Sequence, residues 1–336
     1  MKAYAIQKFG LEGLVVVDLP MPEPGPNQVL IKMHAWSLNY RDLMTVAGQY
    51  NPRLKLPQIP LSDGAGEVVA TGKNVKSFKV GDRVANTFFE HWISGSLTDE
   101  GARSALGAGR DGVFAEYVAL HEDGIIAVPE HLTYAEAATL PCAALTAWNA
   151  LVVEGKIKAG DTILTLGTGG VSIFALQFAL LNGAQVIITS SSDEKLARAK
   201  KLGASHTINY TENPDWGKQV RQITAGRGVD LVVEVGGAGT FGRSLSALRR
   251  GGTLSLIGVL APGNDVNLLP VLMNGIRVQG IFVGSREMFA SMNAAVSLHQ
   301  MHPVIHRTFG FGEVQDAFLR MESRRHFGKV CIAMQP

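Results

Sequence analysis

One segment limits the possible folds more than any other part of this 336-residue chain. An apolar strand expected at Thr162 to Leu166 runs directly into Gly167-Thr168-Gly169-Gly170-Val171-Ser172, and an apolar helix is expected at Ile173 to Leu181. Such a turn suits a dinucleotide pyrophosphate because it is tight, leaves the backbone bare, and presents the N–H groups of a helix N-terminus. Ser172 stands where a third glycine is usual. The alternative is an ordinary strand-to-helix turn, and the position within a strand–helix–strand unit favours the dinucleotide site.

The region around this turn repeats the alternation of strand and helix. Further apolar strands are expected at residues 185–189, 230–235 and 253–257, and helices at 171–182 and 193–202. Strands that are apolar throughout are buried on both faces, as in a parallel sheet with helices on both sides. The sequence therefore predicts an α/β fold with a doubly wound parallel sheet of the Rossmann type.

The first third of the chain reads differently. Short strands, such as those expected at residues 14–17 and 28–33, are separated by proline-rich and glycine-rich segments. This pattern predicts a β-rich domain. A strand pattern at Gly328 to Ile332 predicts that the C-terminal tail rejoins that domain.

Composition excludes several classes of protein. With 46% hydrophobic and 18% charged residues, the chain can bury enough apolar area to fold. Its net charge of +2 is spread without a basic stripe, so no nucleic-acid partner is expected. Cys142 and Cys331 are too few for a disulfide framework, and no apolar run approaches the ~20 residues of a membrane span. We expect a cytoplasmic protein with no membrane partner.

The end of the second expected Rossmann strand indicates which dinucleotide binds. An NAD site usually has an acidic residue there, and this chain has Ser190-Ser191-Ser192 followed by Lys195 and Arg198. Hydroxyls and cations suit the 2′-phosphate of NADP(H), whereas an acid would repel it. The alternative makes Ser191 or Asp193 a helix cap, with Asp193 contacting an NAD ribose. The residues favour NADP(H).

Several further segments, taken with the glycine turn, resemble one known family. They are Ser37 to Asp42, Asp63 to Val69, Val80 to Val84, Leu140 to Trp148, Asp230 to Gly239, and His326 to Lys329. Together they resemble the medium-chain dehydrogenase/reductase superfamily, and within it the zinc-free quinone oxidoreductase branch that includes the zeta-crystallins. The resemblance implies a GroES-like β-barrel domain from residues 1–125 and 297–336 and a Rossmann NADP(H)-binding domain from residues 126–296.

The resemblance also bears on metals. Zinc-containing members hold a catalytic metal with Cys, His and Cys, and the matching positions here are Asn39, Ser62 and Cys142. The cysteines of a structural zinc lobe have no counterpart between Asn86 and Val113. We therefore expect no zinc.

Two residues are the candidates for catalysis. Tyr50 lies where related enoyl-thioester reductases have an active-site tyrosine, so its phenol is expected to bind or protonate the substrate; the alternative is a ring that only packs the loop. Asn39 is expected to offer its amide to cofactor or substrate; the alternative is an amide bonded to neighbouring backbone. Arg41 and Asp42 are expected to form a local salt bridge.

The cofactor-binding residues are expected along the whole Rossmann domain and near the end of the chain. They are Thr146, Gly167, Gly169, Gly170, Val171, Ser190, Ser191, Lys195, Tyr210, Gly258, Phe282, Val283 and Lys329, with Ile257, Val259 and Gly284 as neighbours.

These observations favour an NADPH-dependent reductase that transfers hydride to quinones or α,β-unsaturated carbonyl compounds without a metal. One alternative is a metal-independent carbonyl or alcohol oxidoreductase. Another is a non-catalytic NADPH-binding protein of crystallin-like or RNA-binding use. A homodimer through the last Rossmann strand, near Val278 to Val283, is expected from the resemblance.

Overall fold

The computed structural model describes residues 1–258, 260 and 266–334. They form two compact units, one from Met1–Leu145 with Gly284–Pro336 and one from Thr146–Val283. The expected limit at 296/297 differs from the observed one because α10 (Arg286–Leu298) packs on the first unit, and residues 126–145, expected in the Rossmann domain, also belong to the first unit. Arg286 Nε donates to the carbonyl of Ile125, and Asn293 Nδ2 donates to that of Ala127.

The first unit is built around a seven-stranded sheet in the order β14-β15-β3-β4-β5-β7, with β6 also paired to β3. Its strands are β3 (Gln28–Ser37), β4 (Gly64–Thr71), β5 (Arg83–Asn86), β6 (Tyr117–His121), β7 (Ile125–Ala127), β14 (Ile305–Gly310) and β15 (Lys329–Ala333), and β1 (Lys2–Ile6) pairs with β2 (Leu14–Asp18). Its helices are η1 (Leu11–Gly13), α1 (Tyr40–Val46), α2 (Asp99–Arg103), η2 (Glu122–Gly124), α3 (Tyr134–Ala137), η3 (Leu140–Ala144), α10, η5 (Phe311–Glu313) and α11 (Val314–Glu322). The prediction of a β-rich domain that the C-terminal strand rejoins is confirmed.

The register of β15 against β3 matters most for the site. The two strands are antiparallel, and Cys331 lies opposite Ser37. Continued by two residues toward the start of β15, the same register brings Lys329 opposite Asn39. At Asn39 the chain has left β3 and enters α1. The apolar core of the first unit holds these strands in place. In this core the ring of Tyr4 stacks on that of Phe114, with centroids 4.7 Å apart.

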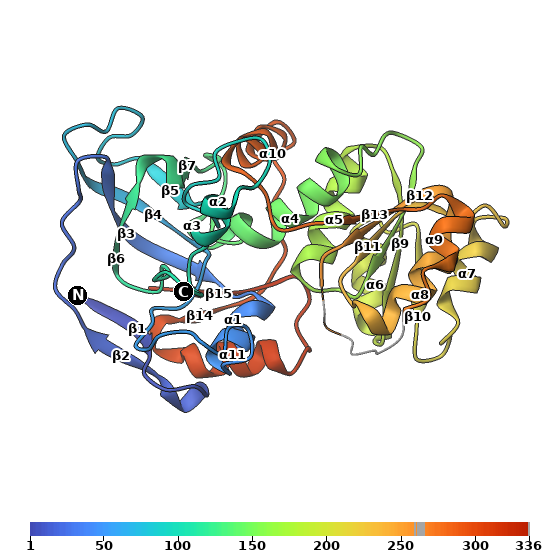
Figure 1. Ribbon diagram of the computed structural model, residues 1–336, viewed down its shortest axis with the longest axis horizontal. Coiled ribbons are helices and arrows are strands. Elements are labelled where there is room, and N and C mark those ends of the chain that lie inside the picture. The colour runs from blue at the N-terminus through green and yellow to red at the C-terminus, as the bar shows by residue number, and fades with distance from the viewer. Residues whose placement is uncertain (259, 261–265, 335–336) are drawn as a thin grey trace. The chain divides into compact units, whose positions relative to one another are not determined.

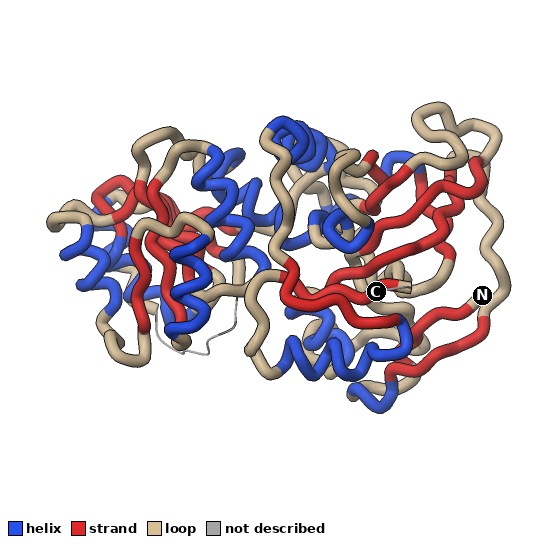
Figure 2. Tube along the Cα trace, turned by 180° about the vertical axis from the view of Figure 1, so that it is seen from behind, coloured by secondary structure: helices blue, strands red, loops and turns tan. Residues whose placement is uncertain are grey.

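The second unit has a six-stranded sheet in the order β10-β9-β8-β11-β12-β13, and every pair is parallel. Its strands are β8 (Thr162–Leu166), β9 (Gln185–Ser190), β10 (His206–Asn209), β11 (Val229–Glu234), β12 (Leu248–Leu256) and β13 (Arg277–Gly280). Its helices are α4 (Leu145–Trp148, which starts one residue before the unit), η4 (Asn149–Val153), α5 (Gly170–Leu181), α6 (Asp193–Lys201), α7 (Trp216–Ile223), α8 (Ala238–Ala247) and α9 (Leu269–Asn274). This is the strand order of a Rossmann fold, and Figures 1 and 2 show helices on both sides of the sheet.

The predicted fold class is confirmed, and the four Rossmann strands expected from their apolar runs are all present. Within the part of the chain that is described, no helix is both long enough and apolar enough to cross a bilayer.

Candidate active site

The glycine turn joins β8 to α5 as the sequence predicts. Gly167 has φ 72°, a left-handed conformation that favours glycine. Gly169 precedes the first helical residue, and a Cβ on either glycine would meet nothing within 4 Å. The space next to the turn is therefore open to a ligand, while Gly170 and Val171 form the first turn of α5.

Ser172, which stands where a third glycine is usual, has a structural role in the turn. Its hydroxyl donates to the carbonyl of Leu166 over 2.6 Å and is buried. The bond ties the first turn of α5 to the last residue of β8, so the hydroxyl fixes the geometry of the turn.

The serines after β9 also have defined roles. The Oγ atom of Ser190 accepts from the backbone N–H of Ser192, and Ser192 Oγ accepts from that of Lys195. The cap of α6 is thus Ser192, rather than Ser191 or Asp193, and Ser191 is exposed. Asp193 Oδ1 accepts from Asn209 Nδ2 over 2.9 Å, so this carboxylate is already engaged.

The first two turns of α6 carry the cations Lys195 and Arg198 together with the acids Asp193 and Glu194. Burial lowers the pKa of the Lys195 ammonium, and the nearby Arg198 charge lowers it further, against an opposing effect of Glu194. A bound anion would relieve the repulsion between the two cations. Tyr210 is 41% exposed directly after β10, and its backbone N–H donates to the carbonyl of Ser190.

The expected cofactor residues of this unit mostly follow the carboxyl ends of parallel strands, which share one edge of the sheet. Gly258 follows β12, and a Cβ there would lie 1.9 Å from the carbonyl oxygen of Val235, so only glycine fits. Phe282 follows β13 and is 46% exposed, and Val283 has φ 56° with its carbonyl bonded to Asn149 Nδ2. Thr146 is buried in α4, and Val259 lies outside the described residues.

Sequence reasoning missed Glu234 at the end of β11. This buried carboxylate accepts hydrogen bonds from the backbone N–H groups of Gly236 and Gly237 and from the hydroxyls of Thr240 and Ser244. It shapes the turn into α8 at the same sheet edge. A buried acid next to a Gly-Gly pair was the available signal.

The second group of candidate residues lies in the first unit, around Lys329. Its Nζ atom donates to the Leu38 carbonyl over 2.7 Å and to Asn39 Oδ1 over 2.6 Å, and the residue is 3% exposed. The Asn39 backbone N–H donates to Asp42 Oδ2, and together these bonds fix the start of α1. Lys329, expected at the cofactor, is thus bonded to the expected catalytic residue Asn39.

Asp63 links the remaining members of this group. It is fully buried, its Oδ1 accepts from Ser62 Oγ over 2.7 Å, and its Oδ2 accepts from the Cys142 backbone N–H over 3.1 Å. Burial raises the pKa of Asp63, and the Lys329 charge lowers it. Asn39, Ser62 and Cys142 are therefore brought together around a carboxylate and an ammonium. We call these five residues the Lys329 cluster.

The Lys329 cluster does not fit zinc. An amide, a hydroxyl and one thiol are a poor ligand set. Burial and the Asp63 carboxylate both raise the pKa of the Cys142 thiol, so the thiolate that a metal needs is disfavoured. Across the described ranges, no group of three or more His, Cys, Asp or Glu side chains is arranged to hold a metal.

Arg41, in the first turn of α1, lies against Tyr50, which follows that helix. The Arg41 guanidinium carbon is 5.1 Å from the ring centroid of Tyr50 and 4.5 Å from that of Phe88, and Tyr50 is 38% exposed. The three buried nitrogens of Arg41 have no hydrogen-bond partner among the described residues, so the expected salt bridge with Asp42 is not formed. Asp42 bonds the Asn39 backbone instead, because that position caps α1.

Asp42 is an unusual carboxylate within this unit. It is 1% exposed, and burial raises its pKa to about 6 despite the opposing effect of the Arg41 charge. The group is thus close to neutrality at mildly acid pH.

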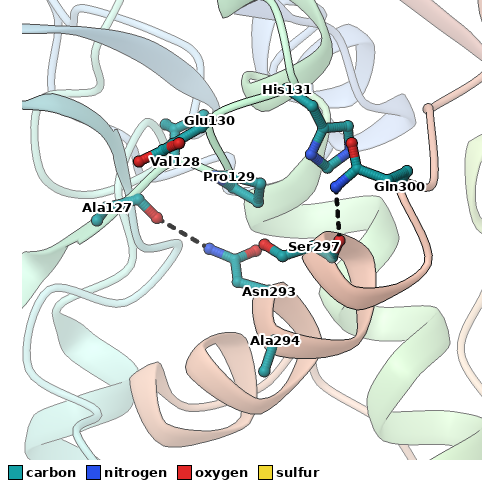
Figure 3. A pocket seen from close by; sticks show the side chains of 9 residues that line it. All are labelled: Ala127, Val128, Pro129, Glu130, His131, Asn293, Ala294, Ser297 and Gln300. Atoms are coloured by element: carbon teal, nitrogen blue, oxygen red, sulfur yellow. Dashed lines mark hydrogen bonds between the residues drawn. The ribbon is translucent and has the colours of Figure 1, made fainter.

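A pocket elsewhere in the first unit shares no residue with the Lys329 cluster. Figure 3 shows the side chains that line it, from the β7–α3 connection and from α10, with Asn293 bonded to Ala127 and Gln300 to Ser297. It contains one acidic residue, Glu130, and one histidine, His131. This lining has none of the candidate catalytic groups.

Comparison with known proteins agrees with this architecture. A family model described as the alcohol dehydrogenase GroES-like domain matches residues 25–130, and one described as zinc-binding dehydrogenase matches residues 170–297. A fold of a GroES-like unit and a Rossmann unit with a dinucleotide turn defines a dehydrogenase or reductase. The chain belongs to the medium-chain dehydrogenase/reductase superfamily and is an oxidoreductase by family.

The similar proteins have several names. A zinc-type alcohol dehydrogenase-like protein of Schizosaccharomyces pombe is 44% identical, with 96% of each chain covered. A quinone oxidoreductase of Sus scrofa is 29% identical (91% of this chain, 89% of that one), and an acryloyl-coenzyme A reductase of Sulfurisphaera tokodaii is 27% identical (96% of each). A solved putative alcohol dehydrogenase from Sinorhizobium meliloti 1021 has a TM-score of 0.92 at 41% identity (99% and 98% covered).

Proposed function

We propose that the protein is an NADPH-dependent reductase that transfers hydride to the activated double bond of α,β-unsaturated carbonyl compounds or to quinones, without a metal. The observation that carries the proposal is the Lys329 cluster. It has an amide, a hydroxyl and a thiol at the three positions where zinc-dependent members have ligands, and the amide of Asn39 is bonded to the buried cation Lys329. Without a Lewis acid to lower the pKa of an alcohol, alcohol oxidation is the harder direction.

Hydride delivery to a β-carbon places negative charge on the carbonyl oxygen of the substrate. Donors that are already in place in a dry environment stabilise such an oxyanion strongly. Asn39 and Lys329 are our candidates for this task in the first unit. Arg41 offers further N–H donors, and the Tyr50 phenol is our candidate for binding or protonating the substrate.

The preference for NADPH rests on the end of β9. Ser190 and Ser191 are hydroxyls at the position where NAD-binding chains usually have an acid, and Lys195 follows on the first turn of α6. Asp193, the acid next to this position, already accepts a hydrogen bond from Asn209 on one of its oxygens. The names quinone oxidoreductase and acryloyl-coenzyme A reductase among the relatives support the acceptor class.

The proposal is tested by oxidation of NADPH with a panel of quinones and enones in the presence of a chelator, followed by loss of reduced-nicotinamide absorbance. We expect turnover with several members of the panel, and a lower kcat in Tyr50→Phe than in Tyr40→Phe, a tyrosine of equal exposure. No turnover across the panel, with NADPH bound tightly, would favour a non-catalytic binding protein.

A second candidate is a carbonyl or alcohol oxidoreductase, favoured by the 44% identity to a protein named zinc-type alcohol dehydrogenase-like. Alcohols with NADP⁺, with and without added zinc, distinguish the two. Oxidation of alcohols that appears only with zinc would support this candidate.

A further inference from the structure

The names of the family model and of one relative imply zinc, whereas the residues of the Lys329 cluster do not fit it. The matched residues 170–297 cover mainly the Rossmann unit, so that match says little about ligands in the first unit. The residues of the Lys329 cluster therefore have to show what the first unit has in place of a metal.

Lys329 is held more firmly than a surface lysine. Only 3% of the residue is exposed, and two of the three N–H donors of its ammonium are used by the Leu38 carbonyl and Asn39 Oδ1. The pairing of β15 with β3 fixes the backbone on which it stands. A buried ammonium is costly to the fold unless such partners surround it.

The charge of Lys329 is matched within the cluster. Asp63 is buried next to it, and the two groups interact electrostatically. Asp63 in turn holds Ser62 through its hydroxyl and Cys142 through its backbone N–H. The cation is thus bonded to Asn39, one of the three positions at which related enzymes bind their metal, and the other two, Ser62 and Cys142, complete that shell by bonding Asp63.

We propose that the Lys329 ammonium is the permanent cation of this site, and that it takes the place of a divalent metal among Asn39, Ser62 and Cys142. A metal ion placed in this shell would lie beside a fixed positive charge, and the repulsion between the two would oppose binding even if the ligand types were restored. By accepting on Oδ1, the Asn39 amide is also oriented so that Nδ2 is its remaining donor group. The metal-excluding role does not depend on the proposed substrate.

The test restores the ligands with and without the lysine. Asn39→Cys with Ser62→His supplies, together with Cys142, the Cys, His and Cys set, and a third substitution, Lys329→Met, removes the ammonium. Each protein is titrated with Co²⁺, whose thiolate charge-transfer and ligand-field absorption report binding independently of turnover. We expect the variant without Lys329 to bind Co²⁺ at least about 100-fold more tightly.

Equal affinity of the two variants, including no binding by either, would overturn the proposal. The thermal midpoint and far-UV circular dichroism of every variant show that it is folded. A second measurement needs no variant: the wild-type protein, incubated with zinc and dialysed, is expected to retain far less than one zinc per chain. Stoichiometric zinc in the wild-type protein would equally overturn the proposal, whereas failure of the reductase assay alone would not.

Discussion

At the scale of single residues, the site depends on polar groups whose partners are distant in sequence. Lys329 bonds Asn39, and Asp63 bonds Cys142, across separations of 290 and 79 residues. Lys329, Asn39 and Asp63 are buried, so each affects both stability and chemistry.

Lys195 is expected to discriminate between coenzymes. Lys195→Ala should raise KM for NADPH about tenfold and leave KM for NADH nearly unchanged, because only NADPH has a 2′-phosphate for the ammonium to bind. Steady-state kinetics with both coenzymes measure this. Lys201→Ala, an exposed lysine of the same helix, is the control, and an equal effect of Lys195→Ala on the two coenzymes would contradict the assignment.

Asp42 is expected to make stability depend on pH. Its pKa of about 6 in the folded protein lies above the ordinary value of 3.8, so the native state binds the extra proton. Stability from this group is therefore present below about pH 4 and is lost as pH rises through about 6. Asp42→Asn, which keeps an oxygen acceptor for the Asn39 N–H, should gain on the order of 2 kcal/mol relative to the wild type between pH 4 and pH 7.

Urea unfolding at several pH values measures this difference. Asp18→Asn, at an exposed position, controls for the loss of one charge. A stability difference between Asp42→Asn and the wild type that stays constant over this pH range would show that Asp42 does not titrate there.

At the scale of elements, the turns after the parallel strands position the candidate cofactor residues. The β8–α5 turn is open, whereas the end of β12 is closely packed against β11. Glycine is needed at Gly167 for its backbone conformation and at Gly258 for lack of space.

Gly258→Ala should destabilise the Rossmann unit by about 2–3 kcal/mol, because its Cβ would lie 1.9 Å from the Val235 carbonyl oxygen. Differential scanning calorimetry measures the loss as a lower Tm. The matched control is Gly280→Ala in β13, where a Cβ meets nothing within 4 Å. A Gly258→Ala protein as stable as the control would show that β11 and β12 separate easily.

The apolar runs were sufficient to predict the Rossmann strands, because burial on both faces leaves a signal within each strand. The glycine turn was predictable for the same local reason. Asp63 and Glu234 were not predicted as site residues, because their roles come from donors that only the fold brings to them. The expected Arg41–Asp42 salt bridge was wrong because capping of α1 and ring stacking engage the two groups separately. Tyr50, Ser191 and Lys195 remain predictions.

At the scale of the whole molecule, the sheet of the Rossmann unit has an edge at β13 that no other described strand covers. β13 is the last strand in the order, Val278 in it is 37% exposed, and apolar side chains on α9 such as Leu272 and Met273 are also exposed. An exposed edge of this kind is a template for pairing with another strand. We propose that two copies of the chain associate there, in the cytoplasm.

Val278→Lys should shift a dimer toward monomer, because a charged side chain on an edge strand opposes pairing. Analytical ultracentrifugation over a range of concentrations measures the change. Val80→Lys, at an exposed valine of the other unit, is the matched control. A wild-type protein that is monomeric at all concentrations, or a dimer unaffected by Val278→Lys, would refute this interface.

The most direct test of metal-independent reduction is hydride tracing with metal-free protein. NADPH carrying deuterium at the transferred position is mixed with an enone in the presence of a chelator, metal content is measured on the same sample, and the product is analysed by NMR. We predict a saturated carbonyl compound with one deuterium on its β-carbon, formed at the same rate with and without the chelator. Turnover that stops with the chelator and returns with zinc would contradict the account.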